Sequence, residues 1–183
     1  GINREDFFEF TWKLPGLIYE GKTYGIPIDF LTFALYYNPK IFEKAGLDPD
    51  RPPRTWEELL EYSKKIVETG AAEYGFCVEG WDLPFLCFVY QAGGRVWIRE
   101  DGKVVGCAIN EEPAVKALKF LADMIHVHKV AYPHVFGETP PLTLFAEGKL
   151  AMYISGPWQI AALRKDYPEF KDWRTAPLPA GPA

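Results

Sequence analysis

A nearly all-apolar run at residues 150–154 (Leu-Ala-Met-Tyr-Ile) constrains the fold of this chain more than any other stretch. Its length suits a strand that is buried on both faces, as in a sheet covered by helices on each side. Gly148 precedes the run and suits the left-handed cap of a preceding helix. Gly156 and Pro157 follow it, and they are predicted to end the strand and begin another helix.

This strand, turn and helix place Trp158 at the rim of the predicted sheet. In open α/β sheets the rim beyond the carboxyl ends of the strands is where ligands bind. Trp158 is therefore a candidate ligand-binding residue, with Gly156 in the turn beside it. The alternative is that Trp158 packs under its helix as ordinary core.

Similar apolar runs alternate with helical patterns along the chain. The predicted strands lie near residues 33–37 and 74–78, the hairpins at 17–28 and 96–105, and the helices near 40–45, 55–70, 83–91 and 111–126. Thr55 and Glu58 form a capping box, and Asn110 is predicted to cap the longest helix. Residues 132–134 are expected to continue as a loop. The alternation predicts an α/β fold with a mostly parallel sheet flanked by helices.

The loop after the strand at 74–78 is the second candidate site. Within four residues it offers two carboxylates and an indole, from Glu79, Trp81 and Asp82. Because it follows a strand, we expect it at the same rim of the sheet as Trp158. Carboxylates accept hydrogen bonds from hydroxyl groups in pairs, and an indole offers a flat apolar face.

Composition limits the classes of partner. The net charge of -5 and the absence of a basic cluster argue against a nucleic-acid partner. The chain has 6 Trp, 10 Tyr and 13 Phe, more than one core needs, which favours a ligand with flat apolar faces such as a sugar. His126 and His128 are two residues apart, which on a helix sends them to different sides, so a metal site is not expected. No cofactor is expected either.

The three cysteines, Cys77, Cys87 and Cys107, lie in apolar surroundings and form no C-x-x-C pair. Buried free thiols are the first expectation, and one disulfide plus one free thiol is the alternative. No apolar run approaches the roughly 18 residues that a membrane span needs, and no signal peptide is recognised at Gly1.

With these elements in place, the chain resembles the extracellular solute-binding proteins of ABC importers, in the family related to maltose-binding protein. The resemblance rests on phrases that occur in the family's order and cover nearly the whole chain: residues 21–27 (Gly-Lys-Thr-Tyr-Gly-Ile-Pro), 35–47, 53–59, the Gly93-Gly94 pair and 145–158.

The resemblance implies the type II periplasmic-binding-protein fold, in which two α/β lobes trap a solute between them. This chain is expected to hold the carboxyl-terminal lobe at 29–175, preceded by a remnant at 1–28 that includes the first hinge crossing. Residues 176–183 are expected to be the return hinge. The expected partners are a mono- or oligosaccharide, the membrane subunits of an ABC transporter and the missing amino-terminal lobe, in the periplasm or at the extracellular surface.

Carried over by position, the ligand-binding residues are Trp158 after Gly156-Pro157, the Trp81-Asp82 loop, and a cleft floor formed by Asp29, Phe30 and Leu31. The maltose binders place a Glu and a Tyr at sites that are Trp81 and Leu83 here. The resemblance therefore implies a sugar without specifying which one.

Three functional hypotheses follow. The leading hypothesis is a sugar-binding lobe that binds its ligand without catalysing any reaction. A glycosidase that uses Asp29 with Asp82 or Glu79 is the enzymatic alternative, and it needs two carboxyls about 5 to 10 Å apart. The third is an excised or engineered lobe whose aromatic surfaces, around residues 7–12 and the exit prolines, drive self-association.

Overall fold

The computed structural model describes residues 3–13, 17–28 and 31–183, and these form two compact units. The smaller unit is Gly1–Thr32 and the larger is Phe33–Ala183. The division therefore falls four residues after the expected start of the lobe, and residues 176–183 belong to the larger unit. There the backbone N–H of Ala180 donates to the Arg54 carbonyl at 2.7 Å, and that of Trp56 donates to the Ala180 carbonyl at 3.1 Å.

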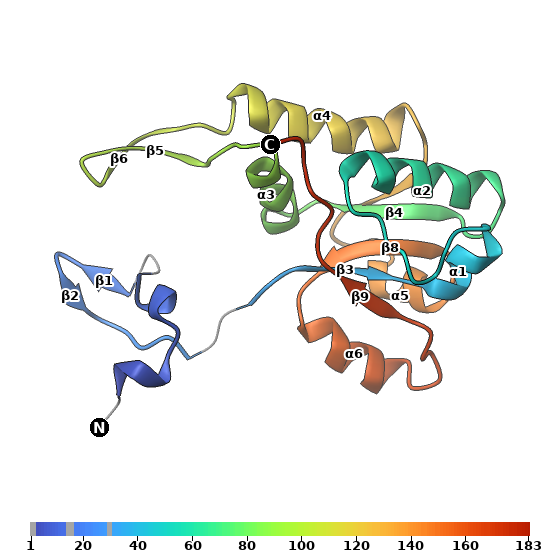
Figure 1. The fold of residues 1–183 in the computed structure, drawn as a ribbon, viewed down its shortest axis with the longest axis horizontal. Helices are drawn as coiled ribbons and strands as arrows, with labels where there is room; N and C mark the ends of the chain where they lie inside the picture. Colours follow the sequence, from blue (N-terminus) through green and yellow to red (C-terminus); the bar gives the residue numbers. More distant parts are fainter. Residues whose placement is uncertain (1–2, 14–16, 29–30) are drawn as a thin grey trace. The chain divides into compact units, whose positions relative to one another are not determined.

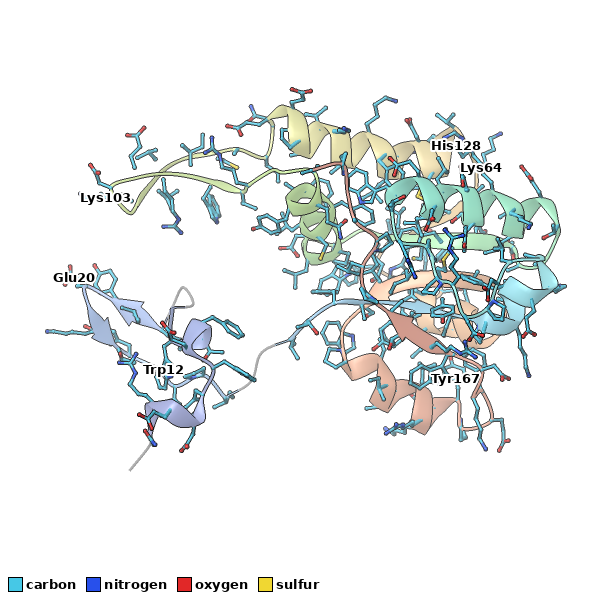
Figure 2. All side chains as sticks on the ribbon, viewed as in Figure 1. Trp12, Glu20, Lys64, Lys103, His128 and Tyr167 are labelled. Atoms are coloured by element: carbon cyan, nitrogen blue, oxygen red, sulfur yellow. The ribbon has the colours of Figure 1, made fainter. Side chains whose placement is uncertain are left out.

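The smaller unit contains two short 3-10 helices and a hairpin. They are η1 (Arg4–Asp6), η2 (Glu9–Lys13), β1 (Ile18–Tyr19) and β2 (Lys22–Thr23). Asn3 caps η1, because its side chain accepts the Glu5 backbone N–H at 3.2 Å. Trp12 is buried in this unit (Figure 2). Its ring packs edge-on to Phe7, and the Arg4 guanidinium lies 4.7 Å from its centroid. The hairpin predicted at residues 17–28 is confirmed in outline.

The larger unit is built on a five-stranded sheet in the order β7-β4-β8-β3-β9 (Figure 1). Its strands are β3 (Ala34–Tyr37), β4 (Tyr74–Glu79), β7 (Ala131–His134), β8 (Leu150–Ser155) and β9 (Arg174–Ala176). β4 is parallel to β7 and β8, whereas β3 is antiparallel to both β8 and β9. Four strands therefore point one way and β3 alone points the other way. The prediction of a mostly parallel sheet is therefore confirmed in the directions of its strands.

Helices cover both faces of this sheet. One face carries α1 (Pro39–Lys44), α2 (Trp56–Glu68), α3 (Asp82–Gln91) and α4 (Glu112–His126), and the other carries α5 (Pro141–Ala146) and α6 (Trp158–Asp166) (Figure 1). One of the two hydrogen bonds of the capping box predicted for α2 is present, because the Thr55 hydroxyl accepts the Glu58 backbone N–H at 3.2 Å. Glu58 itself accepts the Arg54 backbone N–H at 2.7 Å.

β8 is the centre of the fold, as its sequence predicts. All six residues are buried, and the strand contributes side chains to both cores. Met152 and Ile154 face α1 to α4, whereas Tyr153 faces α5 and α6 and stacks on Tyr36 at 5.2 Å between ring centroids. Full burial of each large apolar side chain stabilises the fold by about 1.5–3 kcal/mol. Gly148 precedes the strand with φ +73°, as the predicted cap requires.

Two predictions about local structure are wrong. Residues 132–134 belong to strand β7, not to a loop. Pro133 weakened the strand pattern, but β7 is an edge strand, where a residue without a backbone N–H is tolerated. The N-cap of α4 is Glu111 rather than Asn110, and it forms no side-chain cap hydrogen bond. Pro113 in the first turn supplies the helical φ that starts this helix.

The second predicted hairpin is confirmed as β5 (Trp97–Glu100) and β6 (Lys103–Cys107), with Lys103 near its tip (Figure 2). All three cysteines are free, but only Cys77 is buried; Cys87 is half-buried and Cys107 is exposed on this hairpin. The expectation of buried thiols is therefore wrong for Cys107. Within the described ranges, no helix is long and apolar enough to cross a bilayer, and no three metal-ligating side chains gather.

Candidate functional site

Three strand ends meet at one rim of the sheet. Glu79 ends β4, His134 ends β7 and Ser155 ends β8, and Glu79 is the direct register partner of His134. Parallel strands bring their carboxyl ends to the same edge, which explains why residues from three separate parts of the sequence meet here. The strand alternation then puts these side chains on the face covered by α5 and α6.

The Trp158 ring is seated directly over Gly156. A Cβ atom at position 156 would lie 2.0 Å from the ring carbon Cζ3, so only glycine leaves room for the indole in this position. The turn is held from below, because the Tyr36 hydroxyl donates to the Gly156 carbonyl at 2.8 Å. Trp158 is 40% exposed, so it is not the buried core residue of the alternative interpretation.

Trp81 approaches Trp158 from the carboxyl end of the neighbouring strand β4. The two ring centroids are 6.3 Å apart with an interplanar angle of 62°. Phe33 contacts both indoles, at 5.9 Å from Trp81 and 5.8 Å from Trp158. Because β3 runs against its neighbours, its amino end lies at this rim, where Ala34 pairs with Ser155. The three rings form a continuous aromatic wall from residues 33, 81 and 158.

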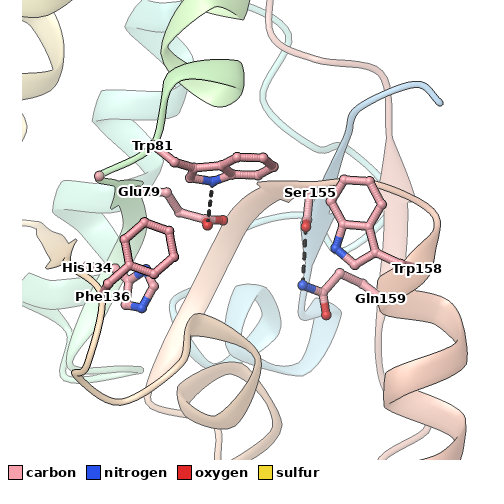
Figure 3. A pocket seen from close by; sticks show the side chains of 8 residues that line it. Glu79, Trp81, His134, Phe136, Ser155, Trp158 and Gln159 are labelled. Atoms are coloured by element: carbon pink, nitrogen blue, oxygen red, sulfur yellow. Dashed lines mark hydrogen bonds between the residues drawn. The ribbon is translucent and has the colours of Figure 1, made fainter.

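The polar groups at the rim are few and already oriented. The Trp81 Nε1–H donates to Glu79 Oε2 at 2.8 Å, and the Gln159 amide donates to Ser155 Oγ at 3.2 Å (Figure 3). Burial raises the pKa of Glu79, and the hydrogen bond from Trp81 opposes that rise. Burial lowers the pKa of His134, and the Glu138 carboxylate opposes that shift. Burial therefore favours the neutral imidazole of His134 and opposes ionisation of the Glu79 carboxyl group.

These side chains line a pocket of about 370 Å³ that is open to solvent. Phe136, which is 85% exposed, lies beside His134 at its edge (Figure 3). The full lining is Glu79, Gly80, Trp81, His134, Phe136, Ser155, Trp158 and Gln159. A volume of this order suits a small polar ligand, and most of the lining is apolar.

The structure brings together part of the predicted site. Trp158 and Trp81 line the pocket, and Gly156 supports the Trp158 ring. Asp82 is exposed and does not line it; its Oδ1 accepts the Leu83 backbone N–H at 3.0 Å at the start of α3. Leu31 is 56% exposed in the smaller unit. Asp29 and Phe30 lie outside the described residues.

Several lining residues were not predicted. Glu79 belongs to the loop that was predicted as the second candidate site, whereas His134, Phe136, Ser155 and Gln159 were not predicted to bind a ligand. His134 was missed because β7 was expected to be a loop. The position of Glu79 in the pocket follows from strand alternation. It lies two residues after Cys77 on β4, so its side chain is on the same face of the sheet as that of Cys77, the face covered by α5 and α6.

The arrangement suits binding more than catalysis. Flat aromatic rings offer apolar surfaces, and Glu79, Ser155 and Gln159 offer hydrogen-bonding groups beside them. A glycosidase needs two carboxyls across one site. Among the described residues only one carboxylate, that of Glu79, lines this pocket.

Known proteins are similar to this chain in both sequence and fold. The sn-glycerol-3-phosphate-binding periplasmic protein UgpB of Pectobacterium atrosepticum is 31% identical over 144 residues, which are 76% of this chain and 32% of that protein. A solute-binding protein of an ABC transporter from Thermotoga lettingae, solved with α-D-tagatose, shares 32% identity at a TM-score of 0.77. That alignment covers 90% of this chain and 43% of the other.

A third similar protein is the maltose-bound MalE3 of T. maritima, with 31% identity and a TM-score of 0.73 over 97% of this chain and 47% of that protein. The chain spans about two fifths of the length of curated relatives such as the putative binding proteins of Brucella, which it matches over 94% of its own length. The family model of the bacterial extracellular solute-binding proteins matches residues 5–183. The chain therefore belongs to the family of bacterial extracellular solute-binding proteins.

Proposed function

We propose that this chain is one lobe of a noncatalytic receptor that captures a sugar for uptake by an ABC importer. The observation that carries the proposal is the aromatic wall of Phe33, Trp81 and Trp158 beside the carboxylate of Glu79, at the rim where strands β4, β7 and β8 end. Support comes from two similar proteins whose structures hold α-D-tagatose and maltose.

A sugar matches this surface in two ways. Its ring presents C–H faces that pack against an indole, and its hydroxyls donate to carboxylate or hydroxyl oxygens at the edge. The rim residues are held by contacts within the lobe, such as the 2.8 Å hydrogen bond from Trp81 to Glu79. Little side-chain entropy is then lost when a ligand binds, which favours affinity.

The remaining parts of the receptor follow from the family. We propose that residues 29–175 form the ligand-binding lobe, that the segments near 26–29 and 176–179 cross to a second lobe, and that this second lobe supplies the other half of the contacts. The receptor then acts in the periplasm or at the extracellular surface and delivers its solute to the membrane subunits of the importer.

Binding can be tested on the 183-residue chain by saturation-transfer NMR, which detects ligands that one lobe holds weakly. The probes are maltose and α-D-tagatose. We expect signals from the sugar C–H protons, and their loss in the variant Trp158→Ala. Trp97→Ala is the matched control, because Trp97 is also exposed but lies on the β5–β6 hairpin. No transfer to either sugar, or equal transfer in both variants, would contradict the proposed site.

A further inference from the structure

We propose that this pocket discriminates by charge: it accepts sugars without acidic groups and rejects phosphorylated ones, with Glu79 as the residue that determines this specificity. The inference rests on the proposed function, since it concerns the same pocket. It separates this chain from the similar protein named for sn-glycerol 3-phosphate, an anionic solute.

The charge of the pocket is the first step. Neither Lys nor Arg is among the described residues that line it, and Glu79 is its charged member. His134 lends no positive charge at neutral pH, because its burial lowers its pKa. The basic residues of α6, Arg164 and Lys165, lie in its last turn, about 9 Å along the helix axis from Trp158. A phosphate in this pocket would meet a carboxylate without a cation beside it.

The indole N–H of the pocket, which could bind an anion, is already used. Proteins bind phosphate with charged side chains, backbone N–H groups and side-chain N–H groups. The Trp81 indole N–H donates to Glu79, and the Gln159 amide donates to Ser155 Oγ. The indole has a single N–H, so Trp81 keeps no donor for an anion, and the remaining donors, the second amide N–H of Gln159 and the hydroxyl of Ser155, carry no positive charge.

Two helices begin near this rim, and helix N-termini favour anions. In α6 the backbone N–H of Gln159 donates to the Gly156 carbonyl at 3.2 Å, and that of Ile160 to the Pro157 carbonyl at 3.1 Å. In α3 the first turn carries Asp82, whose carboxylate accepts the Leu83 backbone N–H. Two backbone N–H groups of α6 and one of α3 are thus used within their own first turns, and α3 also carries the Asp82 carboxylate there.

The position of Glu79 makes its charge effective. The carboxylate is half-buried at the end of β4, beside the aromatic wall, so its field is screened less than that of an exposed carboxylate. Its Oε2 is held by Trp81. No other described residue is recorded donating to it, which leaves Oε1 as an acceptor for a sugar hydroxyl. The same atom repels a phosphate oxygen, so one residue both attracts neutral sugars and excludes acidic ones.

Matched ligand pairs test this inference on the 183-residue chain. The probes are glucose with glucose 6-phosphate, and maltose with maltose 1-phosphate, each titrated by saturation-transfer NMR at pH 7.5. We expect the neutral member of each pair to bind at least about tenfold more tightly than the phosphate. In Glu79→Gln the carboxamide keeps the size and an acceptor oxygen but removes the charge, so the ratio should fall below about threefold.

Glu61→Gln is the matched control, because it removes the same charge from an exposed position on α2, on the opposite face of the sheet. The tenfold affinity ratio should persist in Glu61→Gln. If net charge alone set the ratio, Glu61→Gln and Glu79→Gln would lower it by the same factor. Thermal denaturation of each variant checks that it is folded.

The outcomes separate the two proposals. Tighter binding of the phosphates, or an unchanged ratio in Glu79→Gln, overturns the charge inference while sugar binding stands. Failure of every neutral and phosphorylated sugar to bind the folded chain contradicts the proposed function itself, and the inference falls with it.

Discussion

Replacement of Gly156 by alanine should displace Trp158 without removing it. The added Cβ would lie 2.0, 2.3 and 2.5 Å from Cζ3, Cη2 and Cε3 of the indole, whereas ordinary contacts begin at 3.4 Å. The ring edge must therefore retreat by at least about 1.4 Å. The φ of Gly156 lies outside the left-handed region, so alanine can adopt its backbone conformation and the clash with the ring is the main consequence.

The expected loss of stability follows from the contacts that the Trp158 ring loses when it moves. Its contacts with Phe33 and Trp81 are each worth about 0.5–1.5 kcal/mol. Trp158 is 40% exposed and can swing toward solvent, so we expect Gly156→Ala to lower the free energy of unfolding by only about 1–3 kcal/mol. Loss of an aromatic anchor costs binding about 2 kcal/mol or more, which corresponds to roughly a 30-fold loss of sugar affinity.

Three measurements check this prediction: saturation-transfer NMR with maltose, chemical denaturation, and near-ultraviolet circular dichroism, which senses the coupling of two indoles 6.3 Å apart. Gly106→Ala is the matched control, because its Cβ would meet the end of the flexible Ile98 side chain at 3.3 Å, on the β5–β6 hairpin. The reasoning is refuted if Gly156→Ala keeps both the wild-type affinity and the wild-type dichroism.

Three further predictions concern the support of the pocket. Tyr36→Phe removes the hydrogen bond to the Gly156 carbonyl and should cost about 1–2 kcal/mol in urea denaturation, together with a loss of sugar affinity; unchanged affinity would show that the turn needs no such support. Met152→Ala should cost about 2–5 kcal/mol, because Met152 is fully buried in β8, and a smaller value would mean that the core collapses around the cavity. Because burial raises the pKa of Glu79, its ionised form destabilises the fold; Glu79→Gln should raise the melting temperature at pH 7.5, and this gain should vanish as the pH falls toward the unfolded value of about 4.3. A gain that grows on acidification would reverse the sign of that argument.

The sequence alone predicted the elements whose signals are local. The apolar run of β8 identified a strand that is buried on both faces, and the Thr55 capping box identified the start of α2. Both depend on neighbours within a few residues, which the order of amino acids specifies directly. The same logic placed Trp81 and Trp158 at strand ends, where the structure brings them to one pocket.

Only the tertiary structure decided which groups surround that pocket. The reversed direction of β3 delivers Phe33 to the aromatic wall, and the pairing of β7 with β4 delivers His134, although neither strand direction nor pairing is written in local periodicity. The tertiary structure also decides that Glu79, and not Asp82, lines the pocket. Glu79 still belongs to β4 and takes the pocket face through strand alternation, whereas Asp82 begins α3 and uses its carboxylate on the helix backbone. Contacts between distant residues depend on sheet order and direction, because these set which strand ends share an edge.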